Sequence, residues 1–176
     1  MINALIVDYF GTIADPNRVD SILKPLATED SFQGIYKDAT QKTLDLIIAG
    51  DKEIIQAVRD TFYPGVTDLF DAAKLRGLDT QVYSSGHGPF IVESLKLIGV
   101  ETKFIDPDII GSKKEASSYQ KLKKQMRYQK IIFTTDSNAE AKAALEGEIN
   151  HVVLVDPSNP DYSKVHQLIE AASALR

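Results

Sequence analysis

Short apolar runs alternate with segments of helical periodicity along the 176-residue chain. Five runs have the length and apolar character of buried strands, namely residues 4–7, 80–83, 103–105, 130–133 and 152–155. Apolar residues recur at helical spacing in segments 66–75, 90–97, 114–126, 139–145 and 165–174. Strands that are apolar on both faces and alternate with helices predict a parallel sheet flanked by helices. The predicted fold class is therefore α/β, with a doubly wound parallel sheet.

Residues 16–62 interrupt this alternation. The segment contains no strand pattern, and apolar residues such as Leu44, Ile47 and Ile54 are spaced as in two or three helices. Pro64 and Gly65 then mark the return to the sheet. We therefore expect an α/β core made of residues 1–15 and 63–176, with residues 16–62 inserted after the first strand as a small helical cap.

The composition indicates an ordinary soluble protein, with 43% hydrophobic and 26% charged residues. The chain contains no cysteine, which excludes a disulfide scaffold, a thiolate nucleophile and a cysteine-based metal site. The amino-terminal apolar run is interrupted by Asp8 too early for a signal peptide, and no run approaches the roughly 20 apolar residues that span a membrane. We expect a cytoplasmic protein without a membrane partner.

The formal net charge of −5 gives no general attraction to nucleic acid. Segment 113–130 is lysine-rich, but Tyr119, Leu122 and Met126 recur within it at spacings of three and four. This spacing predicts one buried helix face with the lysines on the solvent side, rather than a nucleic-acid interface.

Chemically useful side chains follow the predicted strands. Residues 8–12 follow the first strand, residues 84–86 follow the second, and Asp136 follows the fourth; Lys113 precedes the helix that leads to the fourth strand. Ligands of open α/β sheets bind beyond the carboxyl ends of the strands, where helix amino termini also point. Carboxylates, hydroxyls, a glycine turn and a lysine at one edge predict a site for phosphate and a metal ion.

These segments resemble a known group of enzymes. Asp8-Tyr9-Phe10-Gly11-Thr12 is similar to the nucleophile motif of the haloacid dehalogenase superfamily, and segments 82–86, 111–119 and 132–144 more specifically resemble the enolase-phosphatases of methionine salvage. Each motif is weak alone, but four occur in the right order. The resemblance implies a Rossmann-like core and does not extend to the cap.

The resemblance also implies a covalent mechanism in which Asp8 attacks phosphorus and forms an aspartyl-phosphate. Mg²⁺ would be held by Asp8, the backbone carbonyl of Phe10 and Asp136, because magnesium takes hard oxygen ligands. A small phosphorylated metabolite would be bound by Thr12, Ser84, Ser85 and Gly86. Lys113 would neutralise the phosphoryl group, with Lys114 as its rival for that role, and Glu140 would lie behind the site and orient a metal-bound water.

Structural explanations exist for the same residues. Asp8 and Asp136 could cap the turn or helix that follows each of them, Ser84 and Ser85 could form a turn, and Lys113 could be a surface lysine. An aspartate between an apolar strand and Gly-Thr favours a functional role for Asp8 more strongly than for the others.

Phe10 departs from the phosphatase pattern, which has an acidic residue at this position as the proton donor. Three interpretations remain open: a phosphatase that uses another acid such as His87, a haloacid dehalogenase-type hydrolase without metal, or a catalytically weak protein that binds a phosphate ligand. Without a cation, Asp136 facing Asp8 would be a costly pair of like charges. This charge balance favours a magnesium-dependent phosphohydrolase.

Overall fold

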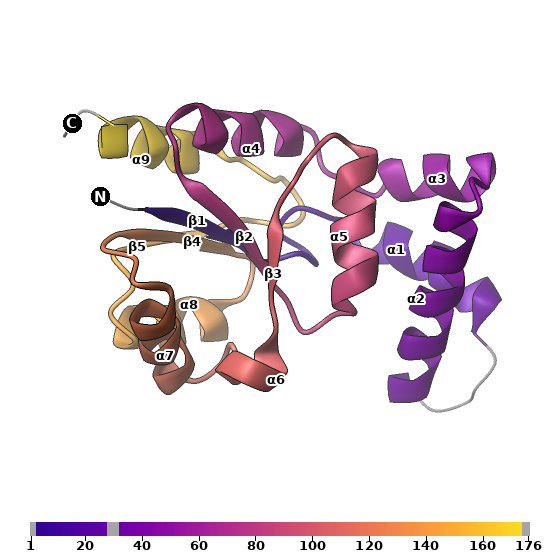
Figure 1. Cartoon of the computed structure of the whole chain (residues 1–176), viewed down its shortest axis with the longest axis horizontal. Coiled ribbons are helices and arrows are strands. Elements are labelled where there is room, and N and C mark those ends of the chain that lie inside the picture. The colour runs from indigo at the N-terminus through magenta and orange to yellow at the C-terminus, as the bar shows by residue number, and fades with distance from the viewer. Residues whose placement is uncertain (1–2, 28–31, 174–176) are drawn as a thin grey trace.

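The computed structural model describes residues 3–27 and 32–173, which contain one five-stranded parallel sheet. The sheet has the order β3-β2-β1-β4-β5, so β1 lies at its centre (Figure 1). Its strands are β1 (Ala4–Val7), β2 (Asp79–Tyr83), β3 (Lys103–Ile105), β4 (Ile131–Thr135) and β5 (His151–Leu154). Val7 pairs with Val82 on one side and with Thr134 on the other. The residues that follow β1, β2 and β4 therefore emerge at one edge of the sheet.

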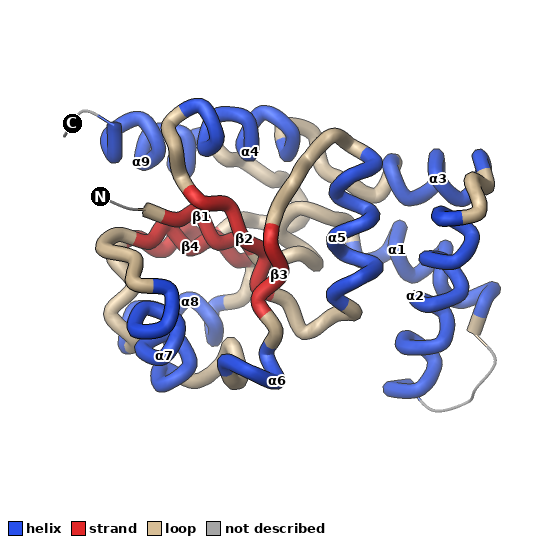
Figure 2. The backbone as a smooth tube through the Cα atoms, in the orientation of Figure 1, coloured by secondary structure: helices blue, strands red, loops and turns tan. Residues whose placement is uncertain are grey.

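Helices cover both faces of the sheet (Figure 2). α4 (Val66–Leu75) and α9 (Ser163–Ser173) lie on one face, and α7 (Ala116–Met126) and α8 (Asn138–Glu146) lie on the other. α5 (Gly88–Leu97) follows β2. The short α6 (Pro107–Ile110) connects β3 to α7.

Alternating side chains of β1 divide the core into two apolar clusters. Leu5 and Val7 pack into a cluster with residues of α4, α5 and α9, such as Leu69. Ala4 and Ile6 pack into a second cluster with residues of α7 and α8. Because successive strand residues point to opposite faces, Asp8 continues the row of Ala4 and Ile6. The fold thus directs Asp8 toward the face covered by α7 and α8.

The segment inserted after β1 is helical, as predicted. It contains α1 (Pro16–Leu23), the 3₁₀ turn η1 (Lys24–Leu26), α2 (Phe32–Ile48) and α3 (Lys52–Arg59), which lie beyond α5 (Figure 1). Val19, Leu23 and Val58 from these helices belong to the same apolar cluster as Leu5. The division into a core and a cap therefore stays a prediction, since the helices share a hydrophobic core with the sheet.

The doubly wound α/β fold class is confirmed, with small shifts in element boundaries. β4 continues to Thr135, beyond the predicted end at residue 133, because Thr134 and Thr135 are buried and pair with β5. The buried face predicted for segment 114–126 is also present, since Tyr119 and Leu122 are fully buried. The last residue of the predicted final helix, 174, lies outside the described residues. Within the described ranges, no helix is long and apolar enough to cross a bilayer.

Candidate active site

Asp8 lies at the carboxyl end of β1, where the backbone holds its carboxylate. Its N–H donates to the Thr134 carbonyl at 2.8 Å, which continues the pairing with β4 by one residue. The N–H of Tyr9 donates to Asp8 Oδ1 at 2.7 Å. Gly11 then turns the chain with a φ of 75°, a conformation that favours glycine. Asp8 is only 4% exposed, and its carboxylate is oriented before any ligand binds.

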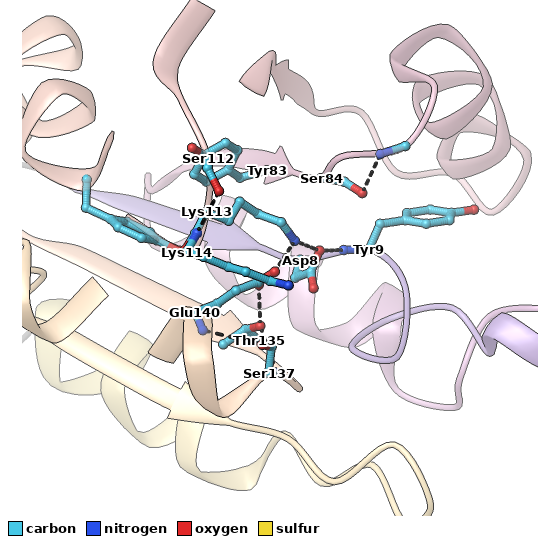
Figure 3. A network of polar contacts seen from close by, with 12 residues as sticks. Asp8, Tyr9, Tyr83, Ser84, Ser112, Lys113, Lys114, Thr135, Ser137 and Glu140 are labelled. Atoms are coloured by element: carbon cyan, nitrogen blue, oxygen red, sulfur yellow. Dashed lines mark hydrogen bonds and ion pairs between the residues drawn. The ribbon is translucent and has the colours of Figure 1, made fainter. Parts of the chain in front are cut away.

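Lys113 bridges two buried carboxylates, as Figure 3 shows. Its Nζ lies 2.6 Å from Asp8 Oδ1 and 3.0 Å from Glu140 Oε1. The other oxygen of Glu140, Oε2, accepts a hydrogen bond from Thr135 at 2.8 Å. The Tyr119 hydroxyl donates to the Lys113 carbonyl at 2.9 Å and fixes the backbone of the lysine. These contacts join segments from β1, the loop before α7, β4 and α8 into one polar network.

Asp136 lies directly beside the turn that follows Asp8. An ideal Cβ on Gly11 would be 2.2 Å from Asp136 Oδ2, so only glycine leaves room for this carboxylate. Asp136 stands immediately before Ser137, whose side chain accepts the N–H of Glu140 and caps the start of α8. The short strand-to-helix connection therefore holds Asp136 at the mouth of the site and Glu140 behind it.

The electrostatics of the site favour a positively charged ligand. Burial, opposed by Lys113 and reinforced by Glu140, raises the pKa of Asp8 to about 7. Burial and Glu140 also raise the pKa of Asp136. The cluster holds the three carboxylates of Asp8, Asp136 and Glu140 against the single ammonium of Lys113. When all are ionised, a surplus of negative charge remains, which destabilises the charged carboxylates.

The donor set fits a hard cation such as Mg²⁺. Both contacts of Asp8 use Oδ1, which leaves Oδ2 without a hydrogen-bond partner in the described structure. The Phe10 carbonyl accepts no backbone hydrogen bond in that part of the chain. The hydroxyl oxygen of Thr12 is buried without a hydrogen-bond partner in the described structure. The described residues hold no cluster of three His, Cys, Asp or Glu side chains that could bind a metal. Oxygens of a backbone carbonyl, of water and of the substrate would therefore complete the coordination of the cation.

The loop after β2 lies at the same edge of the sheet. Ser84 is buried, and its Oγ accepts the N–H of Gly86 at 3.2 Å. Ser85 is exposed beside it, and α5 begins three residues later. The loop thus offers hydroxyls and the amino end of a helix of ten residues, which is suited to an anion.

A groove of about 950 Å³ opens beside this loop. Ser85, Gly86 and His87 line it from the loop, and Lys37 and Leu44 line it from α2. Volumes of this size accommodate small molecules. If a phosphate group binds at the loop after β2, the groove has room for the rest of the ligand.

Comparison with known proteins supports this interpretation, although no protein-family model matches the chain. A match of 118 residues, 61% of the chain, is 30% identical to enolase-phosphatase E1 of Salmo salar and covers 44% of that protein. Enolase-phosphatase E1 of Caenorhabditis elegans is 30% identical over 145 residues, which are 77% of this chain and 53% of the relative. The matches span about half the length of these curated relatives.

Solved structures share the fold over most of the chain. An L-2-haloacid dehalogenase has a TM-score of 0.59 and 13% identity, and covers 93% of this chain and 89% of its own. A HAD family hydrolase from Deinococcus radiodurans R1, with bound phosphate and sodium, has a TM-score of 0.54 and 16% identity over 96% of this chain and 88% of its own. The chain is thus similar in sequence to enolase-phosphatases and shares its fold with a haloacid dehalogenase and a HAD family hydrolase. The resemblance inferred from its motifs is confirmed.

The structure brings together most residues that the superfamily resemblance selected. Asp8, Lys113 and Glu140 are in direct contact. Lys113, which is 7% exposed, makes the contact with Asp8, whereas Lys114 is exposed. Thr12, Asp136 and the loop of Ser84, Ser85 and Gly86 follow the strand ends at the same edge of the sheet.

Two further residues support the site and were not predicted as site residues. Thr135 holds Glu140, and Tyr119 holds the Lys113 backbone. The position of polar Thr135 at the end of the apolar fourth strand could have indicated a site residue. Tyr119 lies on the predicted buried helix face, so the sequence pattern indicates only a core residue there. Glu140 contacts Lys113 through Oε1 and Thr135 through Oε2, so it positions the lysine, and its orientation of a metal-bound water stays a prediction.

Replacing Gly11 with alanine is expected to displace Asp136, because the new Cβ would overlap the carboxylate, and so to weaken the binding of a cation such as Mg²⁺ at this donor set. Gly50→Ala is the matched control. Gly50 has a φ of 81°, similar to the 75° of Gly11, but nothing lies within 4 Å of its Cβ position. Both variants should lose about 1–2 kcal/mol of stability from backbone strain. Titration calorimetry with Mg²⁺ tests the difference, and equal affinities in the two variants would contradict it.

Proposed function

We propose that the chain is a cytoplasmic, magnesium-dependent phosphohydrolase that acts on a small phosphorylated metabolite through an aspartyl-phosphate on Asp8. The observation that carries this proposal is the buried Asp8 carboxylate, bonded to Lys113 and lying at the same sheet edge as Asp136. With all groups ionised, a divalent cation would neutralise the surplus negative charge of this cluster and so allow an anionic phosphate to approach Asp8.

Asp8 is arranged as a nucleophile. Oδ1 accepts hydrogen bonds from Lys113 and the Tyr9 N–H, so Oδ2 is the oxygen that remains for attack on phosphorus. The attack forms an Oδ2–P bond and breaks the bond from phosphorus to the leaving group. Water then attacks the same phosphorus, the Oδ2–P bond breaks, and the Asp8 carboxylate is regenerated.

Several groups would hold the transferring phosphoryl oxygens. Ser84 and Ser85 offer hydroxyl donors, Gly86 lies at the amino end of α5, and Thr12 offers a buried hydroxyl. Lys113 contributes a fixed positive charge, oriented by Glu140 before substrate binds. Such preorganised donors stabilise charge that develops in the transition state.

Mg²⁺ would be held by Asp8, the Phe10 carbonyl and Asp136. When bound, the cation would neutralise negative charge on the phosphoryl group. The raised pKa values of Asp8 and Asp136 support this assignment, because a cation favours the ionised form of both carboxylates.

The relatives support a phosphate substrate. The curated proteins reported above are enolase-phosphatases, and one solved neighbour holds phosphate. The match to the curated relatives is partial, so the methionine-salvage substrate itself is not part of the proposal.

Dehalogenation is a second candidate, supported by the aromatic Phe10 and by the fold shared with an L-2-haloacid dehalogenase. A metal-free mechanism would require another cation beside Asp136. Among the described residues, the charged groups that act on Asp136 are Glu140 and Lys113, and no arginine is paired with it. The charge balance therefore favours the phosphatase.

An assay with phosphate monoesters and acyl phosphates on one side and 2-haloacids on the other, each with Mg²⁺ and with chelator, tests the proposal. We expect phosphate release that requires Mg²⁺ and no halide release. Halide release that persists in chelator would replace the proposal with the dehalogenase. Absence of both products would contradict the proposed hydrolase activity.

A further inference from the structure

We propose that this site accepts phosphoryl groups from donors whose leaving group departs without a proton, with acyl phosphates as the substrate class. This inference rests on the phosphohydrolase function proposed above. It follows from what surrounds Asp8, namely a packed phenyl ring and proton donors that are already committed elsewhere.

The phenyl ring of Phe10 lies between the turn that follows Asp8 and the loop of residues 84–86 that follows β2. The ring packs edge-on against Tyr9, with ring centroids 4.9 Å apart at 85°. An ideal Cβ on Gly86 would be 2.7 Å from Phe10 Cε2, so the ring lies directly against this loop. The ring cannot donate a proton, and its packing on Tyr9 and Gly86 keeps it in place.

The hydroxyl groups near the site are poor proton donors for a leaving group. Tyr9 is bonded to Ser94 of α5, Tyr83 donates to the Gly111 carbonyl, and Tyr119 donates to the Lys113 carbonyl. Burial also raises the pKa of Tyr119, and that of Tyr83 to about 12, which weakens both as acids.

The charged groups around Asp8 are committed in the same way. The Lys113 ammonium is shared between Asp8 and Glu140. His87 lines the groove, but burial and the nearby Lys37 lower its imidazole pKa, so it is mostly neutral at pH 7. Tyr63 has its pKa raised by burial and by Asp15. None of these described side chains is a strong acid aimed at a departing oxygen.

Acyl phosphates need no such acid. Asp8 Oδ2 forms a bond to phosphorus, the bond from phosphorus to the acyl oxygen breaks, and the electron pair leaves on a carboxylate that is stable without a proton. An alkyl phosphate would instead expel an alkoxide, and general acid catalysis of such a step contributes roughly 10²–10⁴-fold. The missing acid therefore penalises alkyl phosphates by about that factor and leaves acyl phosphates almost unaffected.

The second step gives an independent signature. In hydrolysis of the aspartyl-phosphate, the proton of the attacking water passes to a phosphoryl oxygen and then to solvent, because Phe10 cannot accept it. This step is expected to be slower than transfer from an acyl phosphate. The phosphorylated Asp8 should accumulate, and the leaving group should appear in a stoichiometric burst.

The test measures kcat/KM with Mg²⁺ for acetyl phosphate, for aryl phosphates of increasing leaving-group pKa and for glycerol 3-phosphate, together with the intact mass of the protein during turnover. We expect a steep decline as the leaving group becomes more basic, a burst with acetyl phosphate, and a covalent phosphoryl adduct that Asp8→Asn lacks. The adduct is a readout that does not depend on turnover.

Phe10→Asp and Phe10→Leu separate the chemistry of this position from its packing. Phe10→Asp should raise activity on glycerol 3-phosphate roughly 10²–10⁴-fold and remove the burst, whereas Phe10→Leu should keep the steep dependence. Circular dichroism checks that Phe10→Asp folds. If it does not fold, the dependence of the wild-type kcat/KM on the leaving-group pKa, together with the wild-type burst, decides the inference.

Two results would be distinguishable failures. Wild-type protein that hydrolyses glycerol 3-phosphate as fast as acetyl phosphate would overturn this inference while the phosphatase stands. Loss of that activity in His87→Gln would then identify the acid. Absence of phosphate release and of an adduct with every donor would overturn the phosphohydrolase function itself.

Discussion

Replacement of Asp8 with asparagine is expected to abolish Mg²⁺-dependent phosphate release while the protein remains folded. Asparagine keeps the size of the side chain, so the turn at Gly11 and the contact with the Tyr9 N–H can persist. It lacks the carboxylate oxygen that attacks phosphorus. Removal of a nucleophile that acts together with its neighbours typically costs about 10³-fold or more. Steady-state phosphate release and the intact mass of the reacting protein measure the loss.

The same substitution is expected to change the pH dependence of stability. The pKa of Asp8 rises from 3.8 to about 7 on folding, so between these values the folded protein binds more protons than the unfolded chain. Its free energy of unfolding, measured in chelator, should therefore fall as pH rises through this window. Asp8→Asn should remove this part of the decline. Urea unfolding at a series of pH values measures it.

Asp71→Asn is the matched control, because Asp71 is an exposed residue of α4. We expect wild-type activity and the wild-type decline of stability with pH from this variant. Retention of phosphate release and of the phosphoryl adduct in Asp8→Asn would show that another group is the nucleophile.

Lys113→Met is expected to cause the largest loss of stability. Lys113 is buried between Asp8 and Glu140 at 2.6 and 3.0 Å, and methionine would leave two buried carboxylates without their cation. Removing one partner of a buried charge pair typically costs about 3–5 kcal/mol. Urea unfolding in chelator at pH 7 measures the loss, and phosphate release should also fall about 10²–10³-fold, the cost of one fixed donor.

Lys114→Met provides the control at the neighbouring position, because Lys114 is exposed and its side chain makes no ion pair in the described structure. This variant should keep wild-type stability and activity. Adding Glu140→Gln to Lys113→Met should recover part of the stability by removing one stranded charge, without restoring activity. Equal stability of the Lys113→Met and Lys114→Met variants would contradict the role of Lys113 as the buried counterion.

Much of the framework could be predicted because its signals are local. The apolar runs at residues 4–7 and 130–133 report buried strands, and helical spacing identifies α4, α5 and α7. Parallel strands end at one edge of a sheet, so Asp8, Ser84 and Asp136 could be expected there from their positions alone. The tertiary structure confirms this fold.

The contacts that make these residues a site depend on segments far apart in the chain. Asp8 and Lys113 are separated by 105 residues, and only the folded chain selects Lys113 over Lys114. Glu140 forms an ion pair with Lys113, because it lies in the first turn of α8, which begins just after Asp136.

The sequence by itself determined the succession of strands and helices along the chain, the candidate nucleophile Asp8 and the absence of an acidic side chain at position 10. Each of these depends on residue type and local spacing. The tertiary structure decided which lysine pairs with Asp8, that Asp136 fits only beside Gly11, and that the Phe10 ring lies against Gly86. The physical reason is that side-chain packing and burial arise from distant segments brought together, and local periodicity does not encode them.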